Sequence, residues 1–230
     1  VHGHNNVIGA TIFPHNIGLG ATRNVELIES IGQAVAKEVA STGIIWTFAP
    51  TIAVPRNDTW GRTYEGFSEN TDLVSKLGQS FIEGLQGEDK EFLDEYHVLA
   101  TAKHFVGDGG TFNGVDQGNT MINEQSLKDI HGKPYYDAID ACALSIMASF
   151  NSWNGKKMHG NKYLLSNVLK DQMNFNGFIV GDWNGHGQIP GCEDADCPNA
   201  INAGVDIFMV PEQWEGLYWN TLDQVNSGII

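Results

Sequence analysis

The sequence predicts an α/β fold, an incomplete (β/α)8 TIM-like barrel, and two observations support this prediction. First, short apolar segments typical of buried strands alternate with longer segments typical of helices, which is the order of a parallel sheet covered by helices. Second, polar, glycine-rich or aromatic residues follow the strand segments, as expected where the carboxyl ends of barrel strands form the active face. About six strand–helix units are visible, so a closed barrel would need two more.

The predicted elements cover most of the chain. The strands are predicted at residues 9–13, 44–49, 98–104, 143–149, 177–181 and 205–210. The helices are predicted at residues 25–40, 71–85, 124–141, 162–173, 198–203 and 214–225. Because no internal repeat, low-complexity tract or Pro/Ser-rich linker interrupts this pattern, we expect residues 1–230 to form one partial barrel domain.

The composition argues against two classes of partner. The chain has 13 Lys and Arg against 28 Asp and Glu, with a formal net charge of −15. Nucleic acids and anionic membrane surfaces both need basic residues, so neither is expected to bind. No transmembrane helix or signal peptide is visible. Since the chain starts with Val1 rather than Met, we expect a fragment of a longer protein, with any targeting signal elsewhere.

The three cysteines carry two separate predictions. Cys142 lies in an apolar run and is expected to be a buried free thiol. Cys192 and Cys197 bracket an acidic loop, for which a small disulfide is the favoured interpretation, consistent with an exported, periplasmic or extracellular protein. Zinc is disfavoured because no second Cys or His pair has ligand spacing, and calcium because the loop lacks an EF-hand pattern.

Residues 177–185, GFIVGDWNG, are the most informative segment for function. A short β-branched run ends on Asp182 and Trp183, which a barrel would place at its active face. A carboxylate there could attack or stabilise a cationic sugar carbon, and an indole could stack on a pyranose. In the structural alternative, Asp182 caps the next helix and Trp183 packs on the sheet.

Lys103 and His104 place polar side chains at the end of another predicted strand. Lys103 could form a Schiff base, as in barrel aldolases, or could bind substrate hydroxyls or influence a carboxylate. The structural alternative is a buried ion pair at the barrel rim. The glycines that follow match neither phosphate-binding fingerprint.

A metal site is a weaker alternative. His2 and His4 form an H-x-H pair like that of barrel metallohydrolases, but the pair precedes a predicted strand instead of ending one. Beyond His104, no further histidines stand at strand ends. We therefore expect neither a metal nor another cofactor.

Six motifs occur in a fixed order along nearly the whole chain. They are VHGHNN at 1–6, GATIFPHNIGLG at 9–20, FAP at 48–50, WGR at 60–62, AKHFVGDGGT at 102–111 and DW at 182–183. Together they resemble the first domain of glycoside hydrolase family 3, in its β-glucosidase and exo-β-glucanase branch. The resemblance implies a barrel-like domain with the −1 sugar subsite of a retaining hydrolase that releases glucose from the non-reducing end of β-linked glucosides or gluco-oligosaccharides.

The resemblance also implies roles for individual residues. It makes Asp182 the catalytic nucleophile and Trp183 an aromatic wall of the site. Arg62, Lys103 and His104 are implied to hydrogen-bond the hydroxyls of the terminal glucose.

The chain departs from many relatives at three positions near this site. Gly181 stands where Ser often precedes the nucleophile, Asn184 where Glu often follows the Trp, and Phe150 where some relatives carry a hydroxylated aromatic. None of these changes removes the nucleophile, but they prevent the linkage preference of the relatives from being assigned to this chain. A sister branch acts on β-N-acetylglucosaminides and has an Asp-x-His pair after the loop at 106–109. This chain lacks that pair, which favours the glucoside branch.

A retaining glycosidase needs a second carboxyl group as acid and base. Glu65, Glu69, Asp108 and Asp116 are candidates, and nothing in the sequence singles one out. The resemblance instead implies a Glu from a C-terminal α/β sandwich domain of the same polypeptide, absent here, and a sugar-binding Asp upstream of Val1. The isolated fragment is therefore expected to be inactive. The alternatives are a non-catalytic carbohydrate-binding domain and a metal-dependent barrel hydrolase.

Overall fold

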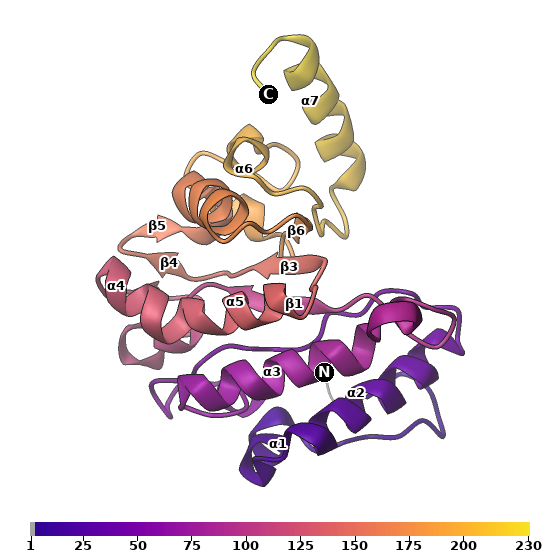
Figure 1. The fold of residues 1–230 in the computed structure, drawn as a ribbon. Coiled ribbons are helices and arrows are strands. Elements are labelled where there is room, and N and C mark those ends of the chain that lie inside the picture. The colour runs from indigo at the N-terminus through magenta and orange to yellow at the C-terminus, as the bar shows by residue number, and fades with distance from the viewer. Residues whose placement is uncertain (1–2) are drawn as a thin grey trace.

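A computed structural model describes residues 3–230 and contains a parallel sheet with helices packed against it (Figure 1). The main sheet consists of β1 (Thr101–Phe105), β3 (Ser145–Ala148) and β6 (Phe178–Val180), in the order β1-β3-β6. All pairs are parallel, and the residues of β3 are fully buried. Strands buried on both faces are expected in a sheet covered by helices.

Single bridges extend this sheet at both edges. Trp46 pairs with Leu99 and Thr51 with Lys103 beside β1, while Ile207 pairs with β6 on the other side, all in parallel orientation. The predicted strands at 44–49 and 205–210 thus take their expected places through isolated bridges. Neighbours in the sheet follow the order of the sequence without reversal, which distinguishes a barrel from a doubly wound sheet. The fold is an incomplete (β/α)8, TIM-like barrel.

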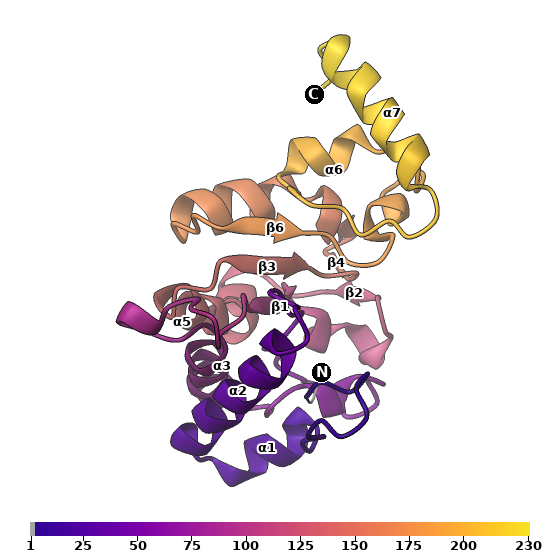
Figure 2. The same ribbon diagram turned by 90° about the vertical axis from the view of Figure 1, so that its right-hand side faces the viewer.

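A small second sheet lies at the carboxyl end of the main sheet. It contains β2 (Asn119–Thr120), β4 (Ser152–Trp153) and β5 (Lys156–Lys157), in the order β2-β4-β5. Figure 2 shows it beyond the ends toward which β3 and β6 point. The connections that follow β1 and β3 are therefore tied together by backbone pairing.

The longer helices of the N-terminal half lie below the main sheet in Figure 1. They are α1 (Asn16–Thr22), α2 (Val25–Ala40), α3 (Thr71–Gln86) and α5 (Lys133–Asp140). Helix α2 packs on α3, and α3 packs on α5. The side chains of Asn24 and Asn70 accept hydrogen bonds from the backbone N–H of Leu27 and Leu73, so both long helices have N-caps.

The predicted helix at 124–141 is interrupted. It comprises α4 (Glu124–Ser126), a π-helical segment η5 (Leu127–Gly132) and α5. Pro134 has no N–H, so it cannot donate to the carbonyl of Ile130 one helical turn earlier. The Thr71 hydroxyl donates to that carbonyl instead, at 3.2 Å. The next predicted helix is likewise π-helical, as η7 (Tyr163–Gln172).

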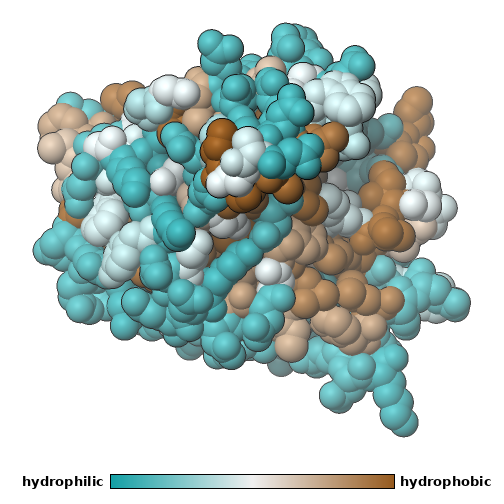
Figure 3. Space-filling view, turned by 90° about the horizontal axis from the view of Figure 1, so that it is seen from above, coloured by the Kyte–Doolittle hydropathy of each residue, from teal (hydrophilic) through white to brown (hydrophobic). Residues whose placement is uncertain are grey.

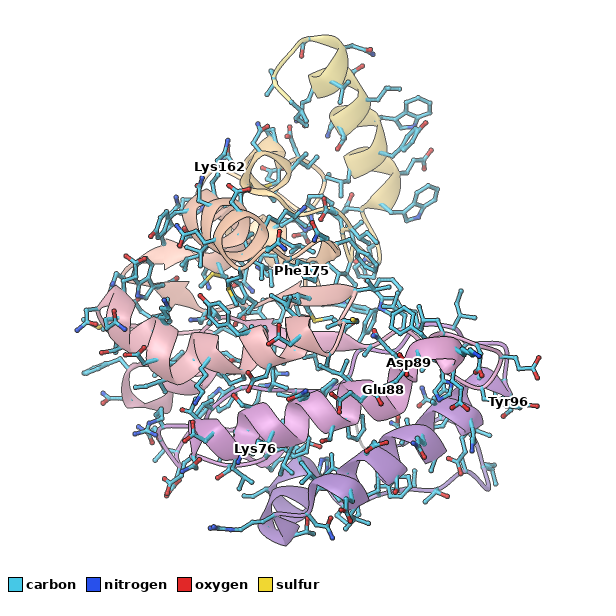
Figure 4. All side chains as sticks on the ribbon, viewed as in Figure 1. Lys76, Glu88, Asp89, Tyr96, Lys162 and Phe175 are labelled. Carbon is cyan, nitrogen blue, oxygen red and sulfur yellow. A yellow bond between two sulfur atoms is a disulfide. The ribbon has the colours of Figure 1, made fainter. Side chains whose placement is uncertain are left out.

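The last two helices are α6 (Pro198–Ala203) and α7 (Trp214–Asn226). Figures 1 and 2 show α7 projecting from the sheet, and Figure 4 shows ring side chains on it pointing away from the molecule. Its exposed apolar residues are Trp214, Tyr218, Trp219, Leu222 and Val225. Figure 3 shows apolar side chains exposed on the face that carries α7.

Short 3-10 turns complete the fold. They are η1 (Thr63–Glu65), η2 (Asp89–Glu91), η3 (Asp108–Gly110), η4 (Phe112–Gly114), η6 (Met158–Gly160) and η8 (Gly185–Gln188). The predicted disulfide between Cys192 and Cys197 is present. Within residues 3–230, no helix is long and apolar enough to span a membrane.

Two predictions were wrong. Residues 9–13 do not form a strand of the main sheet, because Ile12 makes only an isolated antiparallel bridge with Gly3. The N–H and hydroxyl of Thr11 in this segment donate to the Glu38 carboxylate on α2 instead. Cys142 is a free thiol as expected, but it is exposed. It has a φ of 59° in the turn that ends α5, and this turn points its side chain outward.

Candidate active site

Side chains from three of the strand–helix units come together at the carboxyl end of the sheet. Asp182 follows β6 by two residues, His104 lies in β1, and Arg62 lies in the connection after residue 51. The Asp182 Oδ2 atom is 3.8 Å from His104 Nε2, and His104 Nε2 is 3.1 Å from Arg62 Nη2. The structure thus assembles three of the five residues singled out from the sequence.

Arg62 is held in place by Glu65. The Nε and Nη2 groups of Arg62 each donate to one oxygen of the Glu65 carboxylate, both at 2.9 Å. Glu65 lies three residues after Arg62, and the single turn η1 between them brings the two side chains together. Burial is the largest single effect and works against both charges. The mutual hydrogen bonding and the opposite charges nearby together exceed it, so the pKa of Arg62 is raised and that of Glu65 is lowered. A bidentate pair of this kind fixes the plane of the guanidinium.

The contacts of His104 define its tautomer. Its Nε2 atom faces Arg62 Nη2, and a guanidinium can only donate, so Nε2 must be the acceptor. The proton therefore lies on Nδ1, which donates to Asp108 Oδ2 at 2.9 Å. Burial, together with the positive charges of Lys103 and Arg62, lowers the pKa of His104 well below its usual range. His104 is neutral, so its contact with Asp182 is not an ion pair.

Asp108 is a buried carboxylate that orients His104. Its second oxygen accepts the backbone N–H of Gly109 at 3.0 Å. Burial raises the pKa of Asp108 to about 7, although the charge of Arg62 opposes this shift. Proton uptake by this group near neutral pH would change the charge next to His104.

Lys103 lies within β1 and is 9% exposed. Burial lowers the pKa of its ammonium group; the negative charges of Glu65, Asp182 and Asp108 oppose this effect. Lys103 therefore lies within the electrostatic field of the same group of side chains. It brings a second basic side chain close to three carboxylates.

Asp182 has one oxygen fixed and one directed at the site. Its Oδ1 atom accepts the backbone N–H of Trp183 at 2.7 Å, whereas Oδ2 lies near His104. The Asp182 side chain is 14% exposed, so solvent or a ligand can reach it. Trp183 is 58% exposed beside it, which does not fit the structural alternative in which this indole packs on the sheet.

The four candidate acids have different surroundings. Glu65 pairs with Arg62, and Asp108 pairs with His104. Neither pair was predicted, although spacings of three and four residues could have indicated them. Asp116 accepts a hydrogen bond from the Trp60 indole at 3.1 Å, and Glu69 is exposed. None of these contacts marks an acid that faces Asp182.

The metal alternative finds no support among the described residues. Residues 3–230 contain no group of three or more His, Cys, Asp or Glu side chains that could hold a metal ion. His4 Nε2 lies 2.9 Å from the Thr42 hydroxyl, and His2 lies outside the described residues.

One buried residue beside the site, His159, was not found from the sequence. It is buried, and its Nε2 accepts the backbone N–H of Asp182 at 2.9 Å across 23 residues of chain. No local pattern connects two residues so far apart.

Comparison with known proteins identifies the family. The glycosyl hydrolase family 3 N-terminal domain matches residues 1–230. The chain belongs to this family. The family 3 chain is 33% identical over 210 residues to the periplasmic beta-glucosidase of Salmonella typhimurium, covering 89% of the chain and 27% of that protein. It is 35% identical over 181 residues to a beta-xylosidase of Formosa agariphila, covering 78% of the chain and 25% of that protein.

Two solved structures share this fold. The exo-1,3/1,4-beta-glucanase of a Pseudoalteromonas species superposes with a TM-score of 0.98 at 58% identity, over 100% of this chain and 29% of that one. A beta-glucosidase of Listeria innocua, solved with glucose, gives 0.87 at 26% identity, over 96% of this chain and 31% of that one. The family and fold predictions are confirmed, and the chain spans about a quarter to a third of these relatives.

Proposed function

We propose that this chain is the nucleophile-bearing domain of a retaining, exo-acting β-glucoside or β-glucan hydrolase that releases glucose from the non-reducing end. The observation that carries the proposal is the partly exposed Asp182 carboxylate at the carboxyl end of the sheet, with Oδ2 directed at the Arg62–His104 pair. The names of two relatives, a beta-glucosidase and an exo-1,3/1,4-beta-glucanase, support the substrate class.

Asp182 acts as the nucleophile in this mechanism. Its Oδ2 atom attacks the anomeric carbon, the bond to the leaving-group oxygen breaks, and a covalent glycosyl–enzyme ester forms. Water then cleaves the ester and restores the carboxylate. The fixed position of Oδ1 on the Trp183 N–H supports this role, because it limits rotation of the carboxylate.

Arg62, Lys103 and His104 bind the glucose hydroxyls in this proposal. Arg62 and Lys103 can donate charge-assisted hydrogen bonds, which are about twice as strong as neutral ones. Hydrogen bonds to hydroxyls that strengthen in the oxocarbenium-like transition state lower the barrier. The exposed Trp183 indole would stack on the sugar or on the leaving group.

The acid and base come from outside this chain. We assign this role to a Glu in a C-terminal α/β sandwich domain of the same polypeptide, and the coverage of about a quarter to a third of the relatives leaves room for such a domain. In a retaining enzyme this carboxyl group would lie about 5–5.5 Å from Asp182. The Cys192–Cys197 disulfide and the periplasmic relative support an exported protein.

Covalent trapping in the full-length protein tests the proposal. Incubation with an activated 2-deoxy-2-fluoro glucoside should label the peptide that contains Asp182, because the fluorine slows breakdown of the ester. Asp182→Asn should abolish both labelling and turnover, whereas Asp116→Asn, a change at an acidic residue that contacts Trp60, should leave labelling normal. A label on another residue would refute the nucleophile assignment. Full activity of Asp182→Ala would instead favour a carbohydrate-binding domain.

A further inference from the structure

The backbone N–H of Asp182 donates a hydrogen bond to the buried ring of His159. His159 lies in η6, is 1% exposed, and accepts the Asp182 N–H on Nε2 at 2.9 Å. This N–H belongs to the peptide that joins Gly181 to Asp182, directly after β6. The contact therefore acts on the backbone from which the Asp182 carboxylate projects.

The His159 ring is a neutral hydrogen-bond acceptor at Nε2. Since the Asp182 amide donates to Nε2, the ring proton must lie on Nδ1. Burial, together with the charges of His186 and Lys157, lowers the pKa of His159 to about 3. A hydrogen bond between the ring and the Ser149 backbone works in the opposite direction. Ser149 follows β3, so the ring connects the ends of β3 and β6.

The His159 ring packs closely against the backbone of two glycines. A Cβ atom added to Gly185 would lie 2.2 Å from the ring atom Cε1, and one added to Gly181 would lie 3.4 Å from Cδ2. Met158, next to His159, donates its N–H to the Asn151 carbonyl at 3.1 Å, which holds η6 against the end of β3. The Met158 hydrogen bond thus fixes the backbone that carries the ring, and Gly185 in η8 packs against the ring itself.

We propose that His159 is a positioning residue, which fixes the Asp182 peptide and so directs the carboxylate toward the anomeric carbon. The proposal rests on the proposed role of Asp182 as nucleophile. Only two rotatable bonds separate the Asp182 backbone from its carboxylate, so a rotation of the peptide moves Oδ2 directly. A misplacement of about 1 Å can reduce the rate of a reaction about 100-fold.

A matched pair of variants in the full-length protein tests this role. Gln and Met have similar size and flexibility, but only the Gln amide oxygen can accept the Asp182 N–H. We expect His159→Met to lower the rate of inactivation by the 2-deoxy-2-fluoro glucoside about 10- to 100-fold relative to His159→Gln. The inhibition constant of glucose should change less than about threefold, because ground-state binding does not need an aligned nucleophile.

Three outcomes would overturn the proposal. These are equal inactivation rates for His159→Met and wild type, equal losses in both variants, and a loss of glucose binding that matches the loss of rate. If the Met variant does not fold, Gly185→Ala provides the same test, because its methyl group displaces the ring but leaves the acceptor present. The label is mapped on the wild-type protein first. A label away from Asp182 would refute the proposed function, which separates that failure from a failure of this inference.

Discussion

At the scale of single residues, the candidate site depends on partners that fix the orientation of its polar side chains. Glu65 holds Arg62, and Asp108 holds the tautomer of His104. The remaining acceptor of His104 then faces Arg62 and lies near Asp182. A neutral ring can occupy this position between a guanidinium and a carboxylate, whereas an imidazolium would repel Arg62.

Asp108 should affect how stability depends on pH. Its pKa is raised from 3.8 to about 7 in the folded protein, so between pH 4 and 7 the folded state binds a proton that the unfolded state has released. The contribution of Asp108 to stability is therefore present below pH 4 and is lost as pH rises to 7. We expect the free energy of unfolding of wild type, minus that of Asp108→Asn, to fall across this range.

Urea unfolding at several pH values measures this difference. Asp116→Asn serves as a control for the same substitution at another carboxylate, one that accepts a hydrogen bond from the Trp60 indole. A difference between wild type and Asp108→Asn that stays constant from pH 4 to 7 would contradict the assigned shift.

At the scale of elements, close backbone contacts set the helix packing behind the site. Helices α2 and α3 approach each other at Gly84, where an added Cβ would lie 2.2 Å from the Glu29 carbonyl oxygen. The Glu29 carbonyl is part of the helix backbone, so it cannot move away from an added Cβ as the end of a flexible side chain could. The position of α3 in turn places Thr71, whose hydroxyl satisfies the Ile130 carbonyl in η5.

Gly84→Ala should therefore destabilise the fold. Alanine favours a helix over glycine by about 1 kcal/mol, but overpacking against a backbone carbonyl costs about 1–3 kcal/mol or more. We expect a net loss of about 1–2 kcal/mol in the free energy of unfolding, measured by urea denaturation. Gly132→Ala is the matched control, because a Cβ there meets Leu127 at an ordinary 3.5 Å. A gain in stability for Gly84→Ala would show that α2 and α3 can separate without cost.

At the scale of the whole molecule, the chain forms an arc of parallel segments, and a helix with exposed aromatic residues lies at one end. The arc runs from residues 46–51 through β1, β3 and β6 to Ile207. Helix α7 projects beyond it with exposed Trp214 and Trp219 (Figure 1). The chain covers 29% of the exo-1,3/1,4-beta-glucanase that shares this fold.

The isolated chain, residues 1–230, should lack an acid and a base. We expect it not to hydrolyse cellobiose, whose leaving group needs a proton. With a dinitrophenyl β-glucoside, whose leaving group needs none, it should release at most one equivalent of phenolate, since ester breakdown requires a base. Far-ultraviolet circular dichroism checks that the fragment is folded. Multiple turnovers of cellobiose would place the acid within residues 1–230.

Local sequence patterns were sufficient for the elements whose signals are local. Helices α2, α6 and α7 begin where they were predicted to begin, and Cys192 and Cys197 form the predicted disulfide. The patterns failed where non-local contacts decide. Residues 9–13 form a short, mostly apolar segment like a strand, but Thr11 donates hydrogen bonds to Glu38. Cys142 lies in an apolar run but points outward from a turn.

By itself, the sequence determined the fold class, the family and the type of residue that follows each strand, because hydrophobic periodicity and motif order are properties of the chain alone. The roles of Asp182, Arg62, Lys103, His104 and Trp183 stay predictions. Only the tertiary structure decided the tautomer of His104, the pairing of Arg62 with Glu65, and the support of Asp182 by His159. These depend on distances between side chains on different strand–helix connections, and such distances exist only after the sheet has formed.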